Sequence, residues 1–307
     1  MNNFLIVGYG GHVHKNLIPA FKRSKKVEIS GFITRKLPKE PTDVPFYTID
    51  NVLPQNIKNI YIASNTDSHY LLAKKFLLLG YNVLCEKPVC LSRYQLLDLI
   101  KISKTKKLKL QEVCIYTNHI QFQALRNILL ENAGRIRNIR TEFSIPHLEK
   151  SNSKYDLSKG GGALFDVGYY PLSIILNLYK NAKVKSLKLN KEKGYEVDTS
   201  GHCKWELAEF NADSYWSIGK PYQNYIEIET DQSKIFFDRI FSKPHDFEST
   251  YTLNCAGEET VKRIGKDDHF VKIIENFCTN PWQDEDYETE LALTKIFEKR
   301  KSFLNII

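Results

Sequence analysis

The sequence predicts two domains: a doubly wound parallel α/β domain, then an α+β domain whose mostly antiparallel, open-faced sheet has helices on one side. Three observations lead to this fold class. The chain opens with an apolar run that ends in glycines and continues as an amphipathic segment. Strand and helix patterns then alternate up to about Asn118. From Arg135 onward several segments alternate polar and apolar residues, which is typical of antiparallel strands. We therefore expect domains at 1–118 and 119–307.

Composition indicates the class of protein. A chain of 307 residues is long enough for two cores, and 42% hydrophobic with 26% charged residues is typical of a soluble globular protein. Its apolar runs are far shorter than the roughly 20 residues of a membrane span. The first residues lead directly into a strand without the basic start of a signal peptide. The six cysteines show no CxxC pair and no zinc-ligand spacing, which indicates reduced thiols and no metal site. We expect a cytoplasmic protein.

The net charge of +8 favours anionic partners, among them a phosphate-bearing cofactor, a nucleotide-linked substrate or nucleic acid. The clearest basic run, Lys101–Lys109, has no aromatic residues between its lysines. Surfaces that bind single-stranded nucleic acid combine basic and aromatic side chains. We interpret the run as the solvated end of a helix, and we expect neither nucleic acid nor a membrane as a partner.

The first strand, Phe4–Val7, ends in a glycine turn with the pattern of a dinucleotide-binding loop in a Rossmann domain. Gly8 would make the tight turn, Gly10 would let the backbone approach a pyrophosphate, and the helix that follows would supply amide donors. Val13 stands where the pattern has a smaller residue, at a position that packs against the sheet. The residues assigned to this loop are Gly8, Tyr9, Gly10, Gly11, His12 and Val13.

The second strand, Val27–Ile33, ends in Thr34, Arg35 and Lys36. Proteins that bind NAD usually carry a carboxylate here for the ribose 2′-hydroxyl, whereas a hydroxyl and two cations suit a 2′-phosphate. We therefore predict NADP as the cofactor, with NAD as the second choice. The alternative is that the two cations only begin a solvated loop.

Two further strands are expected at Asn59–Ala63 and Asn82–Cys85, with a helix at Tyr70–Leu79 that stops at Gly80. The carboxyl ends of strands in an open α/β sheet border the ligand crevice. The segments after these two strands therefore supply further candidate cofactor contacts, which are Ser64, Asn65, Thr66, His69, Glu86 and Lys87. A helix and a strand complete the domain at Leu91–Lys104 and Leu108–Ile115.

The second domain is expected to begin with a helix at Ile120–Glu131 and to end with helices at Asp267–Thr279 and Asp284–Ser302. Alternation of polar and apolar residues predicts six strands between them. These strands are 136–145, 184–189, 202–210, 213–218, 225–230 and 234–237.

The segment Lys159–Ser173 contains three consecutive glycines, then Asp166 and Tyr170 four residues apart. Glycine has no Cβ, so this backbone can approach a ligand closely. If the segment is helical, Asp166 and Tyr170 share one face, although Pro171 would force a kink or a fresh start. The alternative is a glycine turn before a core helix, Ala163–Leu178, with a buried tyrosine.

Several of these motifs together resemble the Gfo/Idh/MocA family of NAD(P)-dependent oxidoreductases. The most specific are Glu86-Lys87-Pro88 at a strand end and the run GGGALFDVGYY from Gly160 to Tyr170. A tyrosine at position 170 in place of the commoner histidine is most similar to the branch of nucleotide-sugar 3-ketoreductases and dihydrodiol dehydrogenases. Phe143-x-Ile145-Pro146 and Asp268-His269-Phe270 also resemble that branch.

The resemblance implies three catalytic residues. Lys87 matches the active-site lysine, Tyr170 the residue that transfers a proton, and Asp166 the carboxylate beside it that helps to hold the substrate. Tyrosine has a reference pKa of about 10, so a neighbouring cation such as Lys87 would favour its ionised form and make it a better proton donor.

The sequence departs from the family pattern at two places. Asn65-Thr66 replaces the frequent Pro-Asn, and Lys154 or Tyr155 stands where this branch has an arginine. The resemblance also implies that the free face of the second sheet makes a homodimer or homotetramer. Three aromatic residues could belong to that interface or equally to the core: Tyr215, Trp216 and Trp205.

Three functions are open at this point. The favoured one is hydride transfer between NADP(H) and a sugar carbonyl or alcohol, with reduction of a keto group of a nucleotide-linked hexose or deoxyhexose as first choice. The second is an aldose or trans-dihydrodiol dehydrogenase that works in the oxidative direction. The third is a non-catalytic, NADP-responsive regulator of the same fold, and the presence of Lys87, Asp166 and Tyr170 together argues against it.

Overall fold

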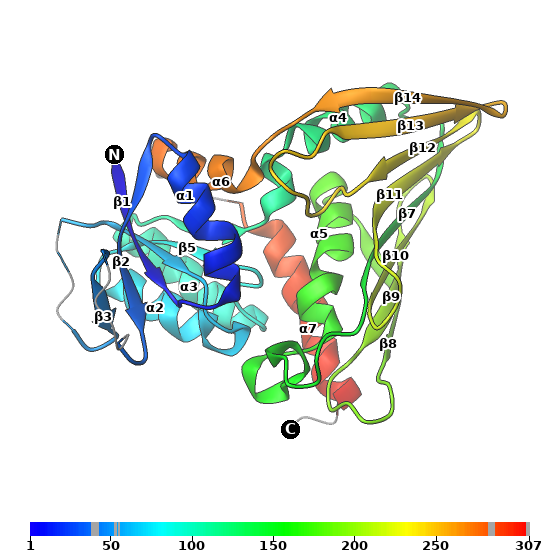
Figure 1. The fold of residues 1–307 in the computed structure, drawn as a ribbon. Coiled ribbons are helices and arrows are strands. Elements are labelled where there is room, and N and C mark those ends of the chain that lie inside the picture. Colours follow the sequence, from blue (N-terminus) through cyan, green and yellow to red (C-terminus); the bar gives the residue numbers. More distant parts are fainter. Residues whose placement is uncertain (38–42, 52–53, 55, 282–285, 305–307) are drawn as a thin grey trace. The chain divides into compact units, whose positions relative to one another are not determined.

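The chain folds into a parallel α/β unit and a mostly antiparallel α+β unit, so the fold class expected from the sequence is confirmed (Figure 1). The computed structural model describes residues 1–37, 43–51, 54, 56–281 and 286–304. One unit comprises residues 1–114 together with 270–286, and the other comprises 115–269 together with 287–307. The sequence did not indicate that 270–286 would join the first unit.

The first unit is a six-stranded parallel sheet with helices on both faces. Its strands are β1 (Asn2–Val7), β2 (Val27–Thr34), β3 (Phe46–Thr48), β4 (Asn59–Ile62), β5 (Asn82–Glu86) and β6 (Leu110–Val113), in the order β3-β2-β1-β4-β5-β6. Its helices are α1 (Ile18–Arg23), α2 (His69–Leu78), α3 (Arg93–Lys106) and α6 (His269–Thr279), with a π-helical turn at Val13–Leu17 and a 3₁₀ turn at Thr66–Ser68.

The strand order positions a ligand site at the carboxyl ends of β1 and β4. From this central pair the chain proceeds to β2 on one side and to β5 and β6 on the other. Because crossovers between parallel strands are right-handed, α1 covers one face and α2 and α3 the other. Loops that diverge in this way leave a crevice between them, which is where such sheets bind dinucleotides.

Helix α6 completes the core on the α1 side of this sheet. The ring of Phe4 on β1 packs edge-on against Phe21 of α1, with centroids 5.3 Å apart, and lies 6.0 Å from the ring of Phe277 on α6. The Lys109 ammonium, which precedes β6, donates to the carbonyl oxygen of Phe277 at 2.6 Å. Helix α6 is therefore part of the hydrophobic core of the first unit.

The second unit is an eight-stranded sheet with helices on one face. Its strands are β7 (Ile136–Ile145), β8 (Lys183–Asn190), β9 (Ser200–Glu206), β10 (Asn211–Ile218), β11 (Gln223–Thr230), β12 (Ser233–Asp238), β13 (Ser249–Cys255) and β14 (Glu258–Gly265), in the order β14-β13-β12-β11-β7-β10-β9-β8. Its helices are α4 (Ile120–Glu131), α5 (Tyr169–Leu178) and α7 (Glu288–Leu304). Shorter turns lie at Ile115–Asn118, Ser153–Tyr155, Leu157–Lys159 and Leu164–Gly168.

All the strand pairs in this sheet are antiparallel except β7 with β10. Figure 1 shows α4, α5 and α7 together on one side of the sheet, so the opposite face carries none of the described helices of this unit. Strands β13 and β14 were not expected from the sequence. The predicted start of the last helix at Asp284 lies outside the described residues.

The sequence left open whether Trp205, Trp216 and Tyr215 belong to the core or to an interface, and the face of the sheet on which each lies decides this. Trp205 and Trp216 are each 1% exposed and lie on the helix-covered face, so both belong to the core. The indole N–H of Trp205 donates to the buried Ser214 hydroxyl at 2.9 Å. Tyr215 lies on the opposite face and is half-buried.

Candidate active site

The glycine loop after β1 has room for a phosphate group. Gly8 has φ +109°, and a Cβ there would lie 2.6 Å from the carbonyl oxygen of Ala63, so only glycine lets β1 and β4 end so close together. Gly10 and Gly11 are exposed, and a Cβ on either would have no heavy atom within 4 Å. The open backbone precedes a helical segment, and Val13 is fully buried beneath it, as expected. These residues fit the pyrophosphate of a dinucleotide.

A hydrogen-bonded chain of side chains connects this loop to the end of β5. The Asn16 amide donates to His12 Nδ1 at 2.9 Å, which leaves His12 Nε2 to donate to Glu86 Oε1 at 2.8 Å. The buried Tyr61 hydroxyl donates to the same carboxylate oxygen at 2.7 Å. Burial acts to raise the pKa of Glu86, but His12, Tyr61 and Lys87 outweigh it and lower that pKa to about 2. The residue before Lys87 is therefore a fixed negative charge.

His69 lies inside the unit and holds two of the loops together. Its Nδ1 lies 2.8 Å from the carbonyl oxygen of Pro88 and its Nε2 lies 3.1 Å from that of Ser64. Burial lowers the pKa of His69, which favours the neutral imidazole with one N–H donor. The ring therefore fixes the segment after β5, and with it the backbone next to Lys87, relative to the end of β4.

The remaining expected cofactor contacts lie at the ends of β2 and β4. Ser64 and Ser68 hydroxyls are 2.8 Å apart, and Ser68 donates to the carbonyl oxygen of Asn65 at 2.7 Å, which shapes the turn that includes Thr66. After β2 the Thr34 hydroxyl donates to the carbonyl oxygen of Lys36 at 2.8 Å. Arg35 and Lys36 are exposed. The ring of Tyr9 packs edge-on against two phenylalanine rings, those of Phe32 and Phe46.

In the second unit, Tyr170 lies among aromatic rings. The helical segment continues without a break from a π-helical turn at Leu164–Gly168 into α5. Pro171 is the third residue of α5, directly after the turn in which the regular α-helical hydrogen-bond pattern is already interrupted. The ring of Tyr170 lies 5.3 Å from that of Phe143 and 5.9 Å from that of Phe241, centroid to centroid. These two buried rings give Tyr170 apolar neighbours. Phe241 was not predicted from the sequence.

Asp166, four residues before Tyr170, is paired with a lysine. The Lys154 ammonium forms a salt bridge with the Asp166 carboxylate, and both side chains are partly exposed. The carbonyl oxygen of Lys154 accepts from the Gly162 N–H at 2.8 Å. Lys154 therefore places a cation beside the Asp166 carboxylate.

The second and third of the consecutive glycines, Gly161 and Gly162, are packed against the protein itself. A Cβ on Gly161 would lie 2.7 Å from the carbonyl oxygens of Lys154 and Asp156. Gly162 has φ +128°, and its Cβ would meet the guanidinium of Arg300 at 2.1 Å. Close approach at these glycines is thus to neighbouring segments of the same unit.

The guanidinium of Arg300 belongs to a buried ion pair. Arg300 Nε donates to Asp198 Oδ1, and Arg300 Nη2 donates to the carbonyl oxygen of Gly161. The other oxygen of Asp198 accepts from the Leu164 N–H at 2.6 Å. The Arg300 and Asp198 side chains are 5% and 0% exposed. This pair anchors the start of the helical segment that carries Asp166 and Tyr170.

The structure brings the predicted site residues together in two groups. The glycine loop, His12, Glu86 and Lys87 belong to the first unit, and Lys154, Asp166 and Tyr170 belong to the second. Among the described residues, no group of three or more His, Cys, Asp or Glu side chains could hold a metal ion. None of the described helices is long and apolar enough to cross a membrane.

Comparisons with known proteins agree across both units. A family model described as "Oxidoreductase family, NAD-binding Rossmann fold" matches residues 2–114, and one described as "GFO/IDH/MocA C-terminal domain" matches residues 122–235. A dTDP-3,4-didehydro-2,6-dideoxy-alpha-D-glucose 3-reductase from Streptomyces antibioticus is 24% identical over 72% of this chain and 69% of its own. A trans-1,2-dihydrobenzene-1,2-diol dehydrogenase from Xenopus laevis is 28% identical over 43% of this chain and 40% of its own.

Solved structures with the same fold include two oxidoreductases. The crystal structure of a 3-ketoreductase from Actinomadura kijaniata, in complex with NADP and TDP-benzene, has a TM-score of 0.88 at 19% identity and covers 98% of this chain and 97% of its own. An aldose-aldose oxidoreductase from Caulobacter crescentus, complexed with glycerol, has a TM-score of 0.83 at 14% identity and covers 98% of each chain.

Proposed function

We propose that this chain, which belongs to the Gfo/Idh/MocA family of oxidoreductases, transfers hydride between NADP(H) and a sugar. The proposed reaction is the reduction of a keto group of a nucleotide-linked hexose or deoxyhexose. The observation that carries this proposal is the set of Lys87, Asp166 and Tyr170, each in its family motif. The dTDP-sugar reductase matches this chain over a larger share than the diol dehydrogenase does, which favours the reductive reaction on a sugar nucleotide.

The side chains have separate tasks in this reaction. The bound nicotinamide supplies the hydride. As the carbonyl carbon gains the hydride, its oxygen gains negative charge, and the Tyr170 hydroxyl donates the proton that neutralises it. The ammonium of Lys87 favours the ionised form of the tyrosine, which eases that donation, and can also hydrogen-bond the developing oxyanion. The Asp166 carboxylate accepts from a sugar hydroxyl while Lys154 donates to another, so the pair orients the ring.

The reaction itself is tested by turnover. The protein is mixed with NADPH and a panel of keto-sugar nucleotides, and the absorbance of the reduced nicotinamide is followed. Consumption of NADPH with a nucleotide-linked keto sugar, and not with the free keto sugar, supports the proposal. Reduction of NADP⁺ by free aldoses or by a trans-dihydrodiol, with no reaction on the sugar nucleotides, would assign the oxidative alternative.

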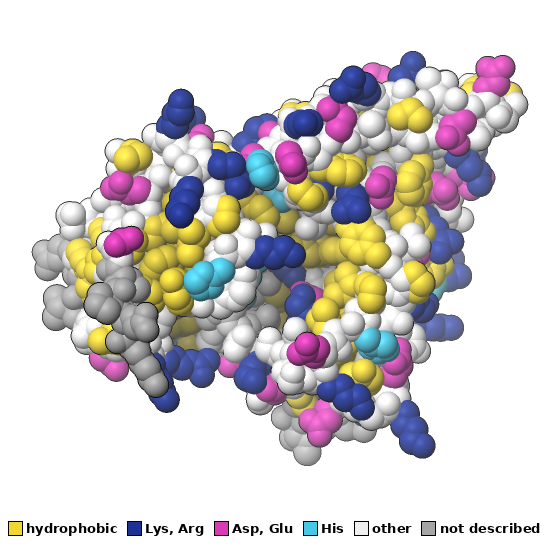
Figure 2. Space-filling model, viewed as in Figure 1, with side chains coloured by type: hydrophobic (Ala, Val, Ile, Leu, Met, Phe, Trp, Pro, Cys, Tyr) yellow, Lys and Arg dark blue, Asp and Glu magenta, His cyan; other side chains and the backbone are white. Residues whose placement is uncertain are grey.

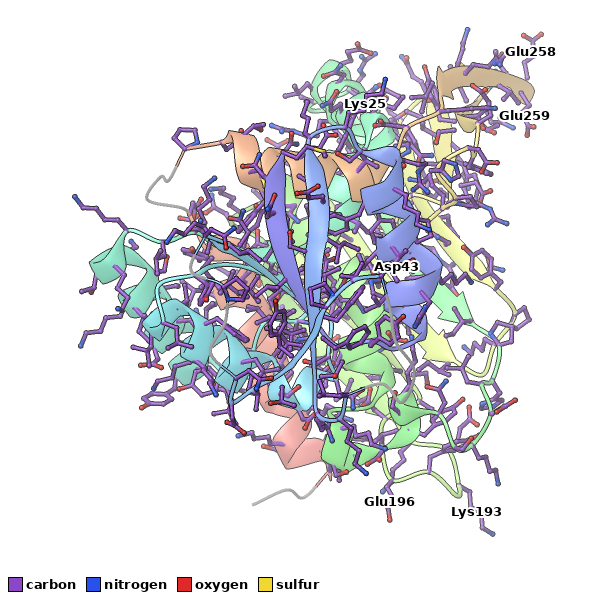
Figure 3. The ribbon with its side chains drawn as sticks, turned by 60° about the vertical axis from the view of Figure 1, so that its left-hand side comes forward. Lys25, Asp43, Lys193, Glu196, Glu258 and Glu259 are labelled. Atoms are coloured by element: carbon purple, nitrogen blue, oxygen red, sulfur yellow. The ribbon has the colours of Figure 1, made fainter. Side chains whose placement is uncertain are left out.

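The cofactor preference rests on the loop after β2. Arg35→Ala is expected to weaken NADPH binding about tenfold or more, because a charge-assisted hydrogen bond contributes on the order of 1.5 to 3 kcal/mol, and to leave NADH binding nearly unchanged. Fluorescence titration with both cofactors measures this. The matched control is Lys25→Ala, which removes an exposed cation just before the amino end of β2, the end opposite to Arg35 (Figure 3). Equal losses for NADPH and NADH in Arg35→Ala would contradict a 2′-phosphate contact.

We also propose that the helix-free face of the second sheet forms the interface of a homo-oligomer. At its centre the Arg140 guanidinium pairs with Glu142 at 3.3 Å and lies 4.7 Å from the centre of the Tyr215 ring. Tyr225 donates to Glu142 at 3.0 Å, and His202 stacks on Tyr215 at 4.1 Å. Burial and the Glu142 carboxylate raise the pKa of Tyr225 to about 12, so it remains a donor. Arg140 is exposed and the other four side chains are half-buried. Tyrosine and arginine are enriched among interface hot spots.

Reversal of a charge at this centre tests the interface. Arg140→Glu is expected to halve the mass measured by light scattering at micromolar concentration. The substitution puts a second carboxylate beside Glu142, and a two-fold axis repeats this negative charge in both copies, so the two faces repel each other. Lys193→Glu, at the tip of the β8–β9 loop (Figure 3), reverses a charge away from this face and should leave the mass unchanged. A wild-type protein that stays monomeric would contradict the interface.

We also propose that the protein is located in the cytoplasm. None of the six cysteines, all of which lie in the described part of the chain, forms a disulfide, and Cys85, Cys90 and Cys203 are buried. Cysteines without disulfides are typical of proteins in reducing compartments.

A further inference from the structure

Strand β14 is the edge of the eight-stranded sheet and is open along its length. It pairs with β13 on one side, and no described strand pairs with its other side. Residues 258–263 are all exposed, and Val261 is 58% exposed. Figure 3 shows Glu258 and Glu259 at the end of this strand, pointing away from the rest of the unit. An exposed edge offers unpaired N–H and C=O groups to another strand.

The turn before β14 determines which of its residues present those groups. Ala256 and Gly257 have φ +53° and +89°, the values of a two-residue type I′ hairpin turn, and this turn closes with Cys255 opposite Glu258. The turn's own hydrogen bond makes that a hydrogen-bonded pair. Hydrogen-bonded and non-hydrogen-bonded pairs alternate along an antiparallel ladder. The backbone groups of residues 259, 261 and 263 therefore point to the open edge.

The same three residues carry a self-complementary set of side chains. Glu259, Val261 and Arg263 alternate along the strand, so all three lie on one face of the sheet. If two copies of β14 run antiparallel about a two-fold axis at Val261, each Glu259 lies opposite the Arg263 of the other copy, and the two valines meet at the axis. The register that matches the backbone donors and acceptors is thus also the register that matches the charges.

We propose that β14 pairs antiparallel with β14 of a second copy of this chain, centred on Val261, and joins the two eight-stranded sheets into one. This surface is separate from the helix-free face proposed above, and the pairing does not depend on the proposed hydride transfer. Two different two-fold surfaces on one chain are what a pair of dimers requires.

The opposite edge of the sheet lacks these features. Strand β8 exposes Lys183, Lys185 and Lys188, which all have the same sign, so two copies of this edge repel each other. Lysines on an edge strand are a common protection against edge-to-edge association. Figure 2 shows charges of both signs on the β13–β14 hairpin, at the upper right of the view. Arg263 also contacts Glu248 at 3.1 Å but is 78% exposed, so its guanidinium is accessible to a second chain.

Charge reversal and its repair test the pairing by sedimentation equilibrium on the full chain. Glu259→Arg and Arg263→Glu each replace two attractive cross-strand pairs with two repulsive ones, so each is expected to weaken association about tenfold or more. The doubly reversed variant restores both pairs and should recover wild-type association. Lys188→Glu on β8 is the control and should leave the mass unchanged. Because the helix-free face is untouched, loss of the edge contact halves the mass whether or not that face also associates.

A cross-link reports the register directly. In a Cys255→Ser background, Val261→Cys is expected to form a disulfide-linked dimer on mild oxidation, because residues opposite each other in such a pair have Cα atoms about 5.5 Å apart, which a disulfide can span. Lys188→Cys in the same background should not cross-link. Unchanged mass in both single reversals, no recovery in the double reversal, or no cross-link at position 261 would each overturn the proposal.

Discussion

Tyr170→Phe is expected to fold and to bind NADPH normally while kcat falls about 10²- to 10⁴-fold, the usual contribution of a general acid. Phenylalanine keeps the ring and its contacts with Phe143 and Phe241, so only the proton donor is lost. The loss should appear in kcat rather than only in KM, because the hydroxyl acts in the transition state. Tyr222→Phe is the matched control, since Tyr222 contacts the same Phe143 ring and has no proposed role in proton transfer.

Lys87→Ala should reduce kcat at least as much, because in the proposed mechanism it removes both the cation that tunes Tyr170 and a donor to the oxyanion. Residues that act as a unit share one effect, so the double variant should be little worse than the poorer single variant. Steady-state kinetics of the three variants on one substrate measure this coupling. A Tyr170→Phe enzyme with nearly full kcat would instead assign the proton to Lys87 or to water, with Tyr170 as part of the pocket wall.

Arg300→Met is expected to lower the free energy of unfolding by about 3 to 5 kcal/mol, since it leaves the carboxylate of Asp198 buried without its counter-ion. Urea denaturation followed by circular dichroism measures this change. The double variant Arg300→Met with Asp198→Asn should be less destabilised than Arg300→Met alone, because the uncompensated charge is gone. Lys295→Met, an exposed site on the same helix α7, should change stability by less than about 0.5 kcal/mol.

The stabilities of Arg300→Met, its double variant with Asp198→Asn and Lys295→Met show whether the lost stability comes from the buried charge of Asp198 or from the packing of Arg300. If the double variant is the least stable, the loss comes from the packing of the guanidinium against Gly161, Gly162 and Phe165, and the charge of Asp198 is not the cause.

Local patterns in the sequence predicted most of the fold. The apolar run at 4–7 with its glycine turn, and the helix at 120–131 that ends before Gly134, have start and stop signals within a few residues. Strand β9 was expected to extend to Phe210 but ends at Glu206, because a turn separates it from β10. Strands β13 and β14 were missed, since β14 is exposed on both faces and so lacks the alternation that marks a half-buried strand.

Contacts between distant parts of the chain could not be read from the sequence. Asp198 and Arg300 are 102 residues apart, and neither stands in a motif. Phe241 follows a strand with no sign that it would lie beside Tyr170. Lys154 was named, together with Tyr155, only as a departure from an expected arginine, and its pairing with Asp166 became visible only in the folded structure. Residue types near a site could be predicted, but not which side chains hold that site in position.

The return of residues 270–286 to the first unit affects how the protein is made. Phe4 on β1 reaches its final neighbour Phe277 only after the whole second sheet has been synthesised. At the usual 5 to 20 residues per second, that segment leaves the ribosome on the order of 10 to 30 s after residue 114. During this interval the nascent first unit exposes the patch around Phe4 that α6 later covers, which is the kind of surface that chaperones bind. A shortened chain that ends at residue 114 would keep that patch permanently.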